Sequence, residues 1–100
     1  MKLSTHGDRL VVSVFTELSA TNAGEIRDQI RTALTGSLVN LDFDLSQVQF
    51  IDSGGLGALI ALQKTAAERQ GRIRLINPMP RVQQILELTR LHRVFEIVRQ

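Results

Sequence analysis

The sequence contains no cysteine, no tryptophan and no tyrosine among its 100 residues. The absence of cysteine excludes disulfide bonds, thiol catalysis and thiolate metal sites, and it is compatible with a reducing compartment. The absence of tyrosine and tryptophan removes the side chains on which nucleic-acid bases most readily stack. The longest apolar run, residues 56–62, is far too short to span a membrane, and no secretory signal opens the chain. We therefore expect a soluble, cytoplasmic protein.

Several patterns of catalytic or nucleotide-binding proteins are also missing. The glycines at 54, 55 and 57 are not followed by the lysine of a phosphate-binding loop or by the third glycine of a dinucleotide fingerprint. The nucleophile elbow of a serine hydrolase is absent, and His6 and His92 have no partner at a metal-binding spacing. We therefore expect no enzyme, no catalytic residue, no metal and no cofactor.

The charge of the chain is modest and dispersed. The formal net charge is +2, and the arginines that supply most of the positive charge are scattered along the sequence without a run. Basic charge without a recognition motif is weak evidence for nucleic-acid binding, so we expect no direct contact with nucleic acid. The length and the 43% hydrophobic content fit one globular domain covering residues 1–100.

Apolar alternation and turn signals predict strands at residues 2–6, 9–15, 38–45, 72–76 and 95–98. Helical spacing predicts a first helix that Gly36 ends, a second over residues 53–70 and a third with Pro80 in its first turn. Helical connections of this length favour parallel pairing with right-handed crossovers, while the first two strands form a hairpin. The predicted fold class is α/β, with a mixed sheet that includes one antiparallel strand.

Finer expectations concern packing and caps. Residues 17–21 are expected to form a loop, followed by a capping box in which Asn22 caps the first helix and Glu25 reaches back. Asp42 is expected on an exposed strand face, and Gly71 is expected to stop the second helix. The buried stripe of that helix is predicted to consist of Leu56, Leu59, Ile60 and Gln63.

The most informative stretch is residues 50–57, Phe-Ile-Asp-Ser-Gly-Gly-Leu-Gly, where a strand turns into a helix. Ser53 can cap that helix, and the free N–H groups and dipole of a helix start also tolerate a phosphate there. The three glycines leave the backbone bare, so another protein's active site can approach Ser53 closely. Two interpretations follow, a plain helix cap and a modification site.

This stretch resembles the signature of STAS domains, the family of bacterial anti-sigma factor antagonists, in which an apolar strand precedes Asp-Ser-x-Gly-Leu-Gly. The resemblance extends to Asp44-Leu45-Ser46 upstream and to Asn77-Pro78 with the apolar pattern that follows. It implies a mixed sheet of four to five strands with about three helices mostly on one face. It also implies that Ser53 is phosphorylated by a partner kinase.

The resemblance implies a partner-switching module. Unphosphorylated, it would bind an anti-sigma factor that is also a serine kinase and so free a sigma factor; a PP2C-type phosphatase would reset it. The partner-binding residues implied are Asp44, Asp52, Ser53, Gly54, Gly55, Leu56 and Gly57. The alternative is a STAS subunit or scaffold of a transport complex or stressosome-like assembly, and weak nucleotide binding is a minor third reading.

The chain departs from the family pattern at three positions. Gly54 replaces the more usual hydroxyl or small residue and removes a possible second phosphosite. Ser19 stands where many members have aspartate, and Arg90 stands where many have glycine. These departures leave the expected fold unchanged and bear on nucleotide binding and on partner identity.

Overall fold

The computed structural model describes all 100 residues, and a five-stranded mixed sheet forms its centre. Its strand order is β1 (Lys2–His6), β2 (Arg9–Ser13), β4 (Asn40–Asp44), β6 (Ile73–Ile76) and β7 (Glu96–Val98). β1 pairs antiparallel with β2, and every other neighbouring pair in the sheet is parallel. The predicted hairpin and the predicted parallel pairing are both confirmed.

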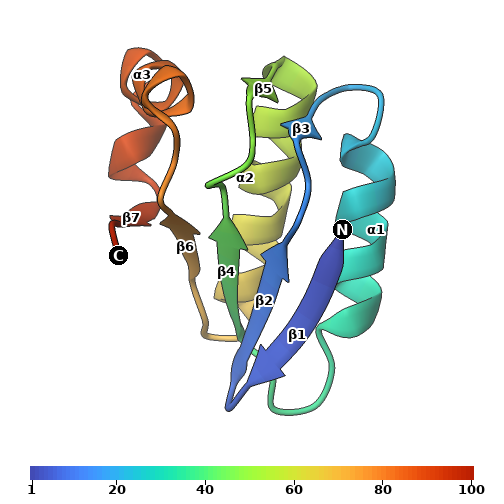
Figure 1. The fold of residues 1–100 in the computed structure, drawn as a ribbon. Coiled ribbons are helices and arrows are strands. Elements are labelled where there is room, and N and C mark those ends of the chain that lie inside the picture. The colour runs from blue at the N-terminus through green and yellow to red at the C-terminus, as the bar shows by residue number, and fades with distance from the viewer.

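Three α-helices connect the strands: α1 (Ala23–Ala33), α2 (Ser53–Glu68) and α3 (Pro80–Leu88). α1 and α2 lie side by side against the same face of the sheet, whereas α3 lies near its β6–β7 edge, followed by a short 3-10 helix, η1 (Leu91–Arg93) (Figure 1). Pro80 occupies the first turn of α3 as predicted, where its missing N–H has no intrahelical partner to lose.

The core lies between the sheet and these helices, because alternate residues of each strand point to one face. β2, β4 and β6 supply pairs of fully buried side chains, namely Leu10, Val12, Leu41, Phe43, Ile73 and Leu75. α1 contributes Ile26 and Ile30. α2 contributes Leu59 and Leu62, each 0% exposed.

The predicted buried stripe of α2 is half wrong. Leu59 is buried as expected, but Ile60 is 47% exposed. The buried positions are Gly55, Ala58, Leu59, Leu62 and Ala66. Gln63 is only half-buried, and its Oε1 accepts a hydrogen bond from the N–H of Ile73 at 3.2 Å. The helix is therefore rotated relative to the predicted register.

A second, two-stranded parallel sheet pairs β3 (Glu17–Leu18) with β5 (Phe50–Ile51). The prediction of a loop over residues 17–21 is wrong for the first two of them. β2 also ends earlier than predicted, because Val14 adopts a left-handed φ of 59° that breaks the extended run. β5 leads into α2, and its partner β3 leads into α1.

The expected capping box at α1 is also wrong. Asn22 is the N-cap by position, but its side chain makes no cap hydrogen bond. Its Oδ1 instead accepts from the N–H of Ser19 at 2.9 Å, and its Nδ2 donates to the carbonyl of Glu17 at 2.9 Å. Glu25 accepts from Gln29 one turn further on. Asn22 therefore closes the turn between β3 and α1.

Gly71 and Arg90 occupy positions where the backbone favours glycine, each for a different reason. Gly71 does not supply the left-handed residue after α2, because Gln70 does, with φ of 66°. A Cβ on Gly71 would lie 1.8 Å from the carbonyl oxygen of Val39, so a close backbone approach requires glycine there. Arg90, where many STAS domains have glycine, adopts φ of 61°, a conformation that glycine reaches without strain.

Asp42 corrects the prediction of an exposed carboxylate. It lies on the sheet face that carries no helix, yet it is only 6% exposed, because arginines on both neighbouring strands cover it. Arg9 donates to its Oδ1 at 2.7 Å, and Arg74 donates to both oxygens at 2.9 and 2.7 Å. Burial raises the pKa of this carboxyl, but the hydrogen bonds and charges of Arg74 and Arg9 outweigh it, so the net pKa is lowered.

We expect Asp42→Asn to lose about 2 kcal/mol of unfolding free energy at neutral pH, since hydrogen bonds to a charged partner contribute on that scale. A carboxyl with a lowered folded pKa stabilises above its unfolded pKa, and that contribution disappears as the pH falls through the folded pKa. Urea denaturation should therefore show the difference between wild type and variant shrinking below about pH 4. Asp28→Asn, at an exposed ion pair, is the control and should change little.

Candidate functional site

Ser53 is the first residue of α2, one residue beyond the end of β5, and its side chain is exposed. The helix cap is Asp52 and not Ser53, which corrects the simpler of the two interpretations. Asp52 has the extended backbone of a cap residue, with φ of −123°, and its Oδ1 accepts from the N–H of Gly55 at 3.0 Å. The Ser53 hydroxyl therefore does not cap the helix.

The second oxygen of Asp52 reaches the turn that precedes α1. The N–H of Ala20 donates to Asp52 Oδ2 at 3.1 Å. The N–H of Gly55, followed by that of Ala20, lowers the pKa of the Asp52 carboxyl below its ordinary value. Asp52 is therefore an ionised side chain that joins the β3–α1 turn to the start of α2.

Glycine is required beside Ser53 for a different reason from the one predicted. A Cβ on Gly55 would lie 2.0 Å from the carbonyl oxygen of Leu18, and one on Gly54 would lie 2.7 Å from the Cα of Ala20. The chain itself fills the space that the sequence suggested was open to another protein. Of the three glycines near Ser53, only Gly57 is exposed with nothing within 4 Å of an added Cβ.

The turn facing Ser53 is held by its own hydrogen bonds. The hydroxyl of Ser19 donates to Glu17 at 2.8 Å and accepts from the N–H of Thr21 at 3.3 Å. Ser19, at the position where many STAS domains have aspartate, is buried. Sequence reasoning missed Leu18 and Ala20 as neighbours of the site; the only signal was the pair of glycines, whose missing side chains indicate close contact.

The other predicted site residues lie in different environments. Leu56 is partly buried and packs against the core. Asp44, expected to border the Ser53 turn, accepts from the N–H of Ser46 at 3.0 Å and shapes the loop after β4. Phe50, which was not predicted, exposes 53% of its surface three residues before Ser53. The structure thus brings Asp52, Gly54 and Gly55 to Ser53, and no hydrogen bond links Asp44 to it.

The arrangement presents a hydroxyl and provides no group that would activate it as a nucleophile. Both oxygens of Asp52 accept hydrogen bonds from backbone N–H groups, which lower the pKa of this carboxyl and so make it a weaker base. No group of three or more histidine, cysteine, aspartate or glutamate side chains is placed to hold a metal ion.

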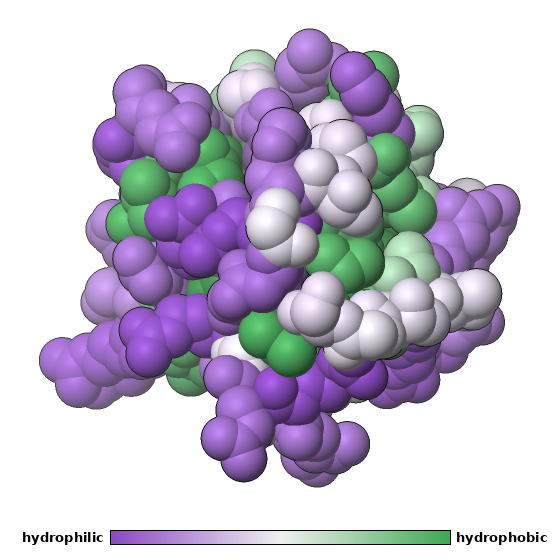
Figure 2. Space-filling view, turned by 90° about the horizontal axis from the view of Figure 1, so that it is seen from below, coloured by the Kyte–Doolittle hydropathy of each residue, from purple (hydrophilic) through white to green (hydrophobic).

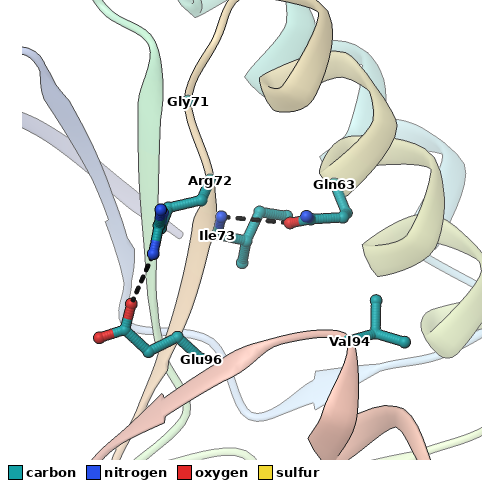
Figure 3. A pocket seen from close by; sticks show the side chains of 6 residues that line it. All are labelled: Gln63, Gly71, Arg72, Ile73, Val94 and Glu96. Carbon is teal, nitrogen blue, oxygen red and sulfur yellow. Dashed lines mark hydrogen bonds and ion pairs between the residues drawn. The ribbon is translucent and has the colours of Figure 1, made fainter.

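One hollow of the molecule lies away from this site, near the start of β6. It has a volume of about 280 Å³ and is lined by Gln63, Gly71, Arg72, Ile73, Val94 and Glu96 (Figure 3). Arg72 and Glu96 form an ion pair along one side of it at 3.8 Å (Figure 3). Seen from below, this end of the molecule is mainly hydrophilic, with hydrophobic residues in separate patches (Figure 2). None of the predicted site residues lines this hollow.

The longest helix, α2, has 16 residues, and no helix is both long enough and apolar enough to span a membrane.

Comparisons with known proteins agree with the geometry. A family model described as the STAS domain matches residues 1–100. The anti-sigma-B factor antagonist of Listeria monocytogenes is 27% identical over 90 residues, covering 90% of this chain and 79% of the relative. The anti-sigma factor antagonist SpoIIAA, unphosphorylated, has a TM-score of 0.86 at 24% identity, covering 99% of this chain and 86% of that one. SpoIIAA of Bacillus in its phosphorylated form has a TM-score of 0.78 at 23% identity, with coverages of 99% and 89%.

Proposed function

Because the chain belongs to the STAS domain family, we propose that it is an anti-sigma factor antagonist whose binding to an anti-sigma factor is switched by phosphorylation of Ser53. The observation that carries this proposal is the exposed hydroxyl at the start of α2, which Asp52 leaves free by taking the cap. Relatives support it, since the Listeria protein is named an antagonist of anti-sigma-B factor and SpoIIAA is known in both phosphorylation states.

A phosphate on Ser53 is electrostatically favourable for the start of α2, but it is unfavourable for a partner protein bound over the same surface. A phosphate adds about −1.5 to −2 charges, and the free N–H groups and dipole of a helix start favour an anion. A partner covering the same surface would have to desolvate that charge beside the ionised Asp52. Leaving such a charge unpaired in an interface costs several kcal/mol. Phosphorylation would therefore release the partner while leaving the fold intact.

The proposed partners are an anti-sigma factor that is also a serine kinase and a PP2C-type phosphatase that removes the phosphate from Ser53. Both would act in the cytoplasm, and their target would be a single STAS domain. The proposed binding surface is centred on Ser53 and the exposed Gly57, one turn further along α2. Asp52, Gly54 and Gly55 fix its shape through residues 18–20. Leu56 and Asp44 belong to its margin. The protein acts in this proposal through binding and not through catalysis.

The test compares Ser53→Asp and Ser53→Ala with wild type in calorimetric titrations against an anti-sigma serine kinase of the same organism. We expect Ser53→Asp to bind at least about tenfold more weakly, which corresponds to about 1.4 kcal/mol. Ser53→Ala should bind like wild type and accept no phosphate from the kinase, because it keeps the surface and lacks the hydroxyl.

The matched control is Ser37→Asp, which adds the same charge at an exposed serine in the α1–β4 loop, at the other end of β4 from Ser53. It should bind like wild type. Circular dichroism should show the same folded spectrum for all variants. Equal affinity of folded Ser53→Asp and Ser53→Ala would contradict the proposed switch.

A further inference from the structure

β1 is an edge strand with an unpaired side, since β2 is its only partner (Figure 1). Its hairpin turn is Gly7–Asp8, so the pair next to the turn is hydrogen-bonded and the bonding alternates from there. The N–H and C=O groups of Leu3 and Thr5 therefore point away from β2. No backbone hydrogen bond outside the regular elements engages them. β1 has neither a proline nor a bulge, two of the devices that prevent edge pairing, and its only lysine is Lys2 at its first position.

A groove adjoins this free edge, between β1 and α1. One hollow of about 420 Å³ is lined by Leu3, Asp28, Gln29 and Thr32. A second of about 320 Å³ includes Phe15, Glu25, Ile26 and Gln29 in its lining. Gln29 lines both, so the two hollows adjoin along the helix. Side chains of a strand added to β1 on the same face as Leu3 would enter this groove.

Two carboxylates line the groove, although the net charge of the protein is positive. That net charge is +2, yet the charged side chains that line the two hollows are both carboxylates, Glu25 and Asp28. Met1, which carries the N-terminal ammonium, also lines the second hollow. The Asp28 side chain is 70% exposed, and its contact with Arg27 is long, at 3.4 Å. Glu25 accepts only from the neutral Gln29, at 3.3 Å. Both carboxylates are therefore accessible to an incoming cation.

From these observations we propose that the free edge of β1 and the groove along α1 bind an extended basic segment of another protein as an added strand. Backbone hydrogen bonds to Leu3 and Thr5 supply the affinity, and lysine or arginine side chains paired with Glu25 and Asp28 supply the selectivity. A second copy of this chain fits less well. Its own β1 carries Leu3 and Thr5 on the groove face, and Lys2 lies on the opposite face.

The probe is an acetylated, amidated peptide, Thr-Lys-Thr-Val-Thr-Lys-Thr, with a matched peptide in which glutamate replaces both lysines. Alternate positions place lysine, valine and lysine on one face of the strand. In NMR titrations of isotope-labelled protein, the lysine peptide should shift and protect the amides of Leu3 and Thr5. The glutamate peptide should bind at least about tenfold more weakly, a difference of about 1.4 kcal/mol.

Two variants test the two parts of the proposal. Thr5→Pro removes an outward N–H without removing a bond to β2, so it should stay folded and lose the peptide. Glu25→Lys with Asp28→Lys should reverse the preference between the peptides. Glu68→Lys, on the exposed part of α2, is the charge control and should not change it.

The proposal is overturned if the two peptides bind equally to wild type, or if the double lysine variant keeps the original preference. The charge variants provide this test even if Thr5→Pro fails to fold. Sedimentation velocity of the free protein should show a monomer, and a dimer that Thr5→Pro abolishes would assign the edge to a second copy. The Ser53 experiments are independent of all these outcomes.

Discussion

Gly55→Ala is expected to lower the unfolding free energy by about 3 kcal/mol, at the upper end of the usual cost of overpacking. The added Cβ would meet the carbonyl oxygen of Leu18 at 2.0 Å, and a backbone carbonyl in a paired strand has little freedom to move. Relief of the clash requires β3 and the start of α2 to separate. A domain of this size has only about 5–15 kcal/mol of stability, so the loss is a large share of the total.

The matched control for Gly55→Ala is Gly57→Ala, the same substitution two residues further along α2. An added Cβ there meets nothing within 4 Å, and alanine is favoured over glycine in a helix by about 1 kcal/mol. Gly57→Ala should therefore be as stable as wild type or slightly more stable. Urea denaturation of the two variants measures the difference. Equal stabilities would mean that α2 does not approach β3 as closely as the structure has it.

Leu59→Ala is expected to cost about 3 kcal/mol, because truncating a fully buried leucine loses its transfer free energy and leaves a cavity. Leu59 is 0% exposed in the centre of the core. Ile60→Ala is the neighbouring comparison and should cost well under about 1 kcal/mol, since Ile60 is 47% exposed. Thermal midpoints should differ by about 8 °C or more between the two variants.

This pair also tests the rotation of α2, because the sequence pattern predicted both residues to be buried. A large loss for both variants would favour the predicted stripe over the structure. Exchange of the expected order, with Ile60→Ala the more damaging, would mean that the exposed face of the helix is assigned wrongly.

The error in α2 has a physical origin. Its residues from 54 to 62 are all glycine or apolar, so hydropathy alone does not identify which side faces the core. α1 was easier, because its polar side is marked by charged residues and Ile26 and Ile30 fall on the other side. The hairpin and the parallel pairing followed from connection lengths, which the sequence displays directly.

The prediction that Asp42 is exposed was wrong for a related reason. The alternation of β4 correctly placed it on the face opposite Leu41 and Phe43, and a charged residue on such a face is usually solvated. Its burial depends on Arg9 and Arg74, which are 33 and 32 positions away in the sequence and are brought together only by strand order. The alternation of residues in a strand indicates which face a side chain occupies. It does not indicate which side chains of neighbouring strands cover that face.

The site was predicted in outline and missed in its contacts. The strand-to-helix pattern located Ser53, and the family resemblance suggested its modification. The strand-to-helix pattern did not distinguish Ser53 from Asp52 as the helix cap, because serine and aspartate both cap helices well. The partners of Gly54 and Gly55 come from residues 18–20, and only the folded chain shows which segment fills the space above a glycine.

The hydrogen bond from Ala20 to Asp52 links residues 32 positions apart, and this separation bears on when the site forms during folding. Contacts between distant residues form late, because the entropy of closing the intervening loop is lost before the contacts repay it. In a nascent or partly unfolded chain, Ser53 therefore belongs to a flexible peptide without a helix start or a neighbouring turn. An enzyme that recognises the folded surface around Ser53 would modify only folded chains. The amount of modified protein would then also be a measure of the amount of correctly folded protein.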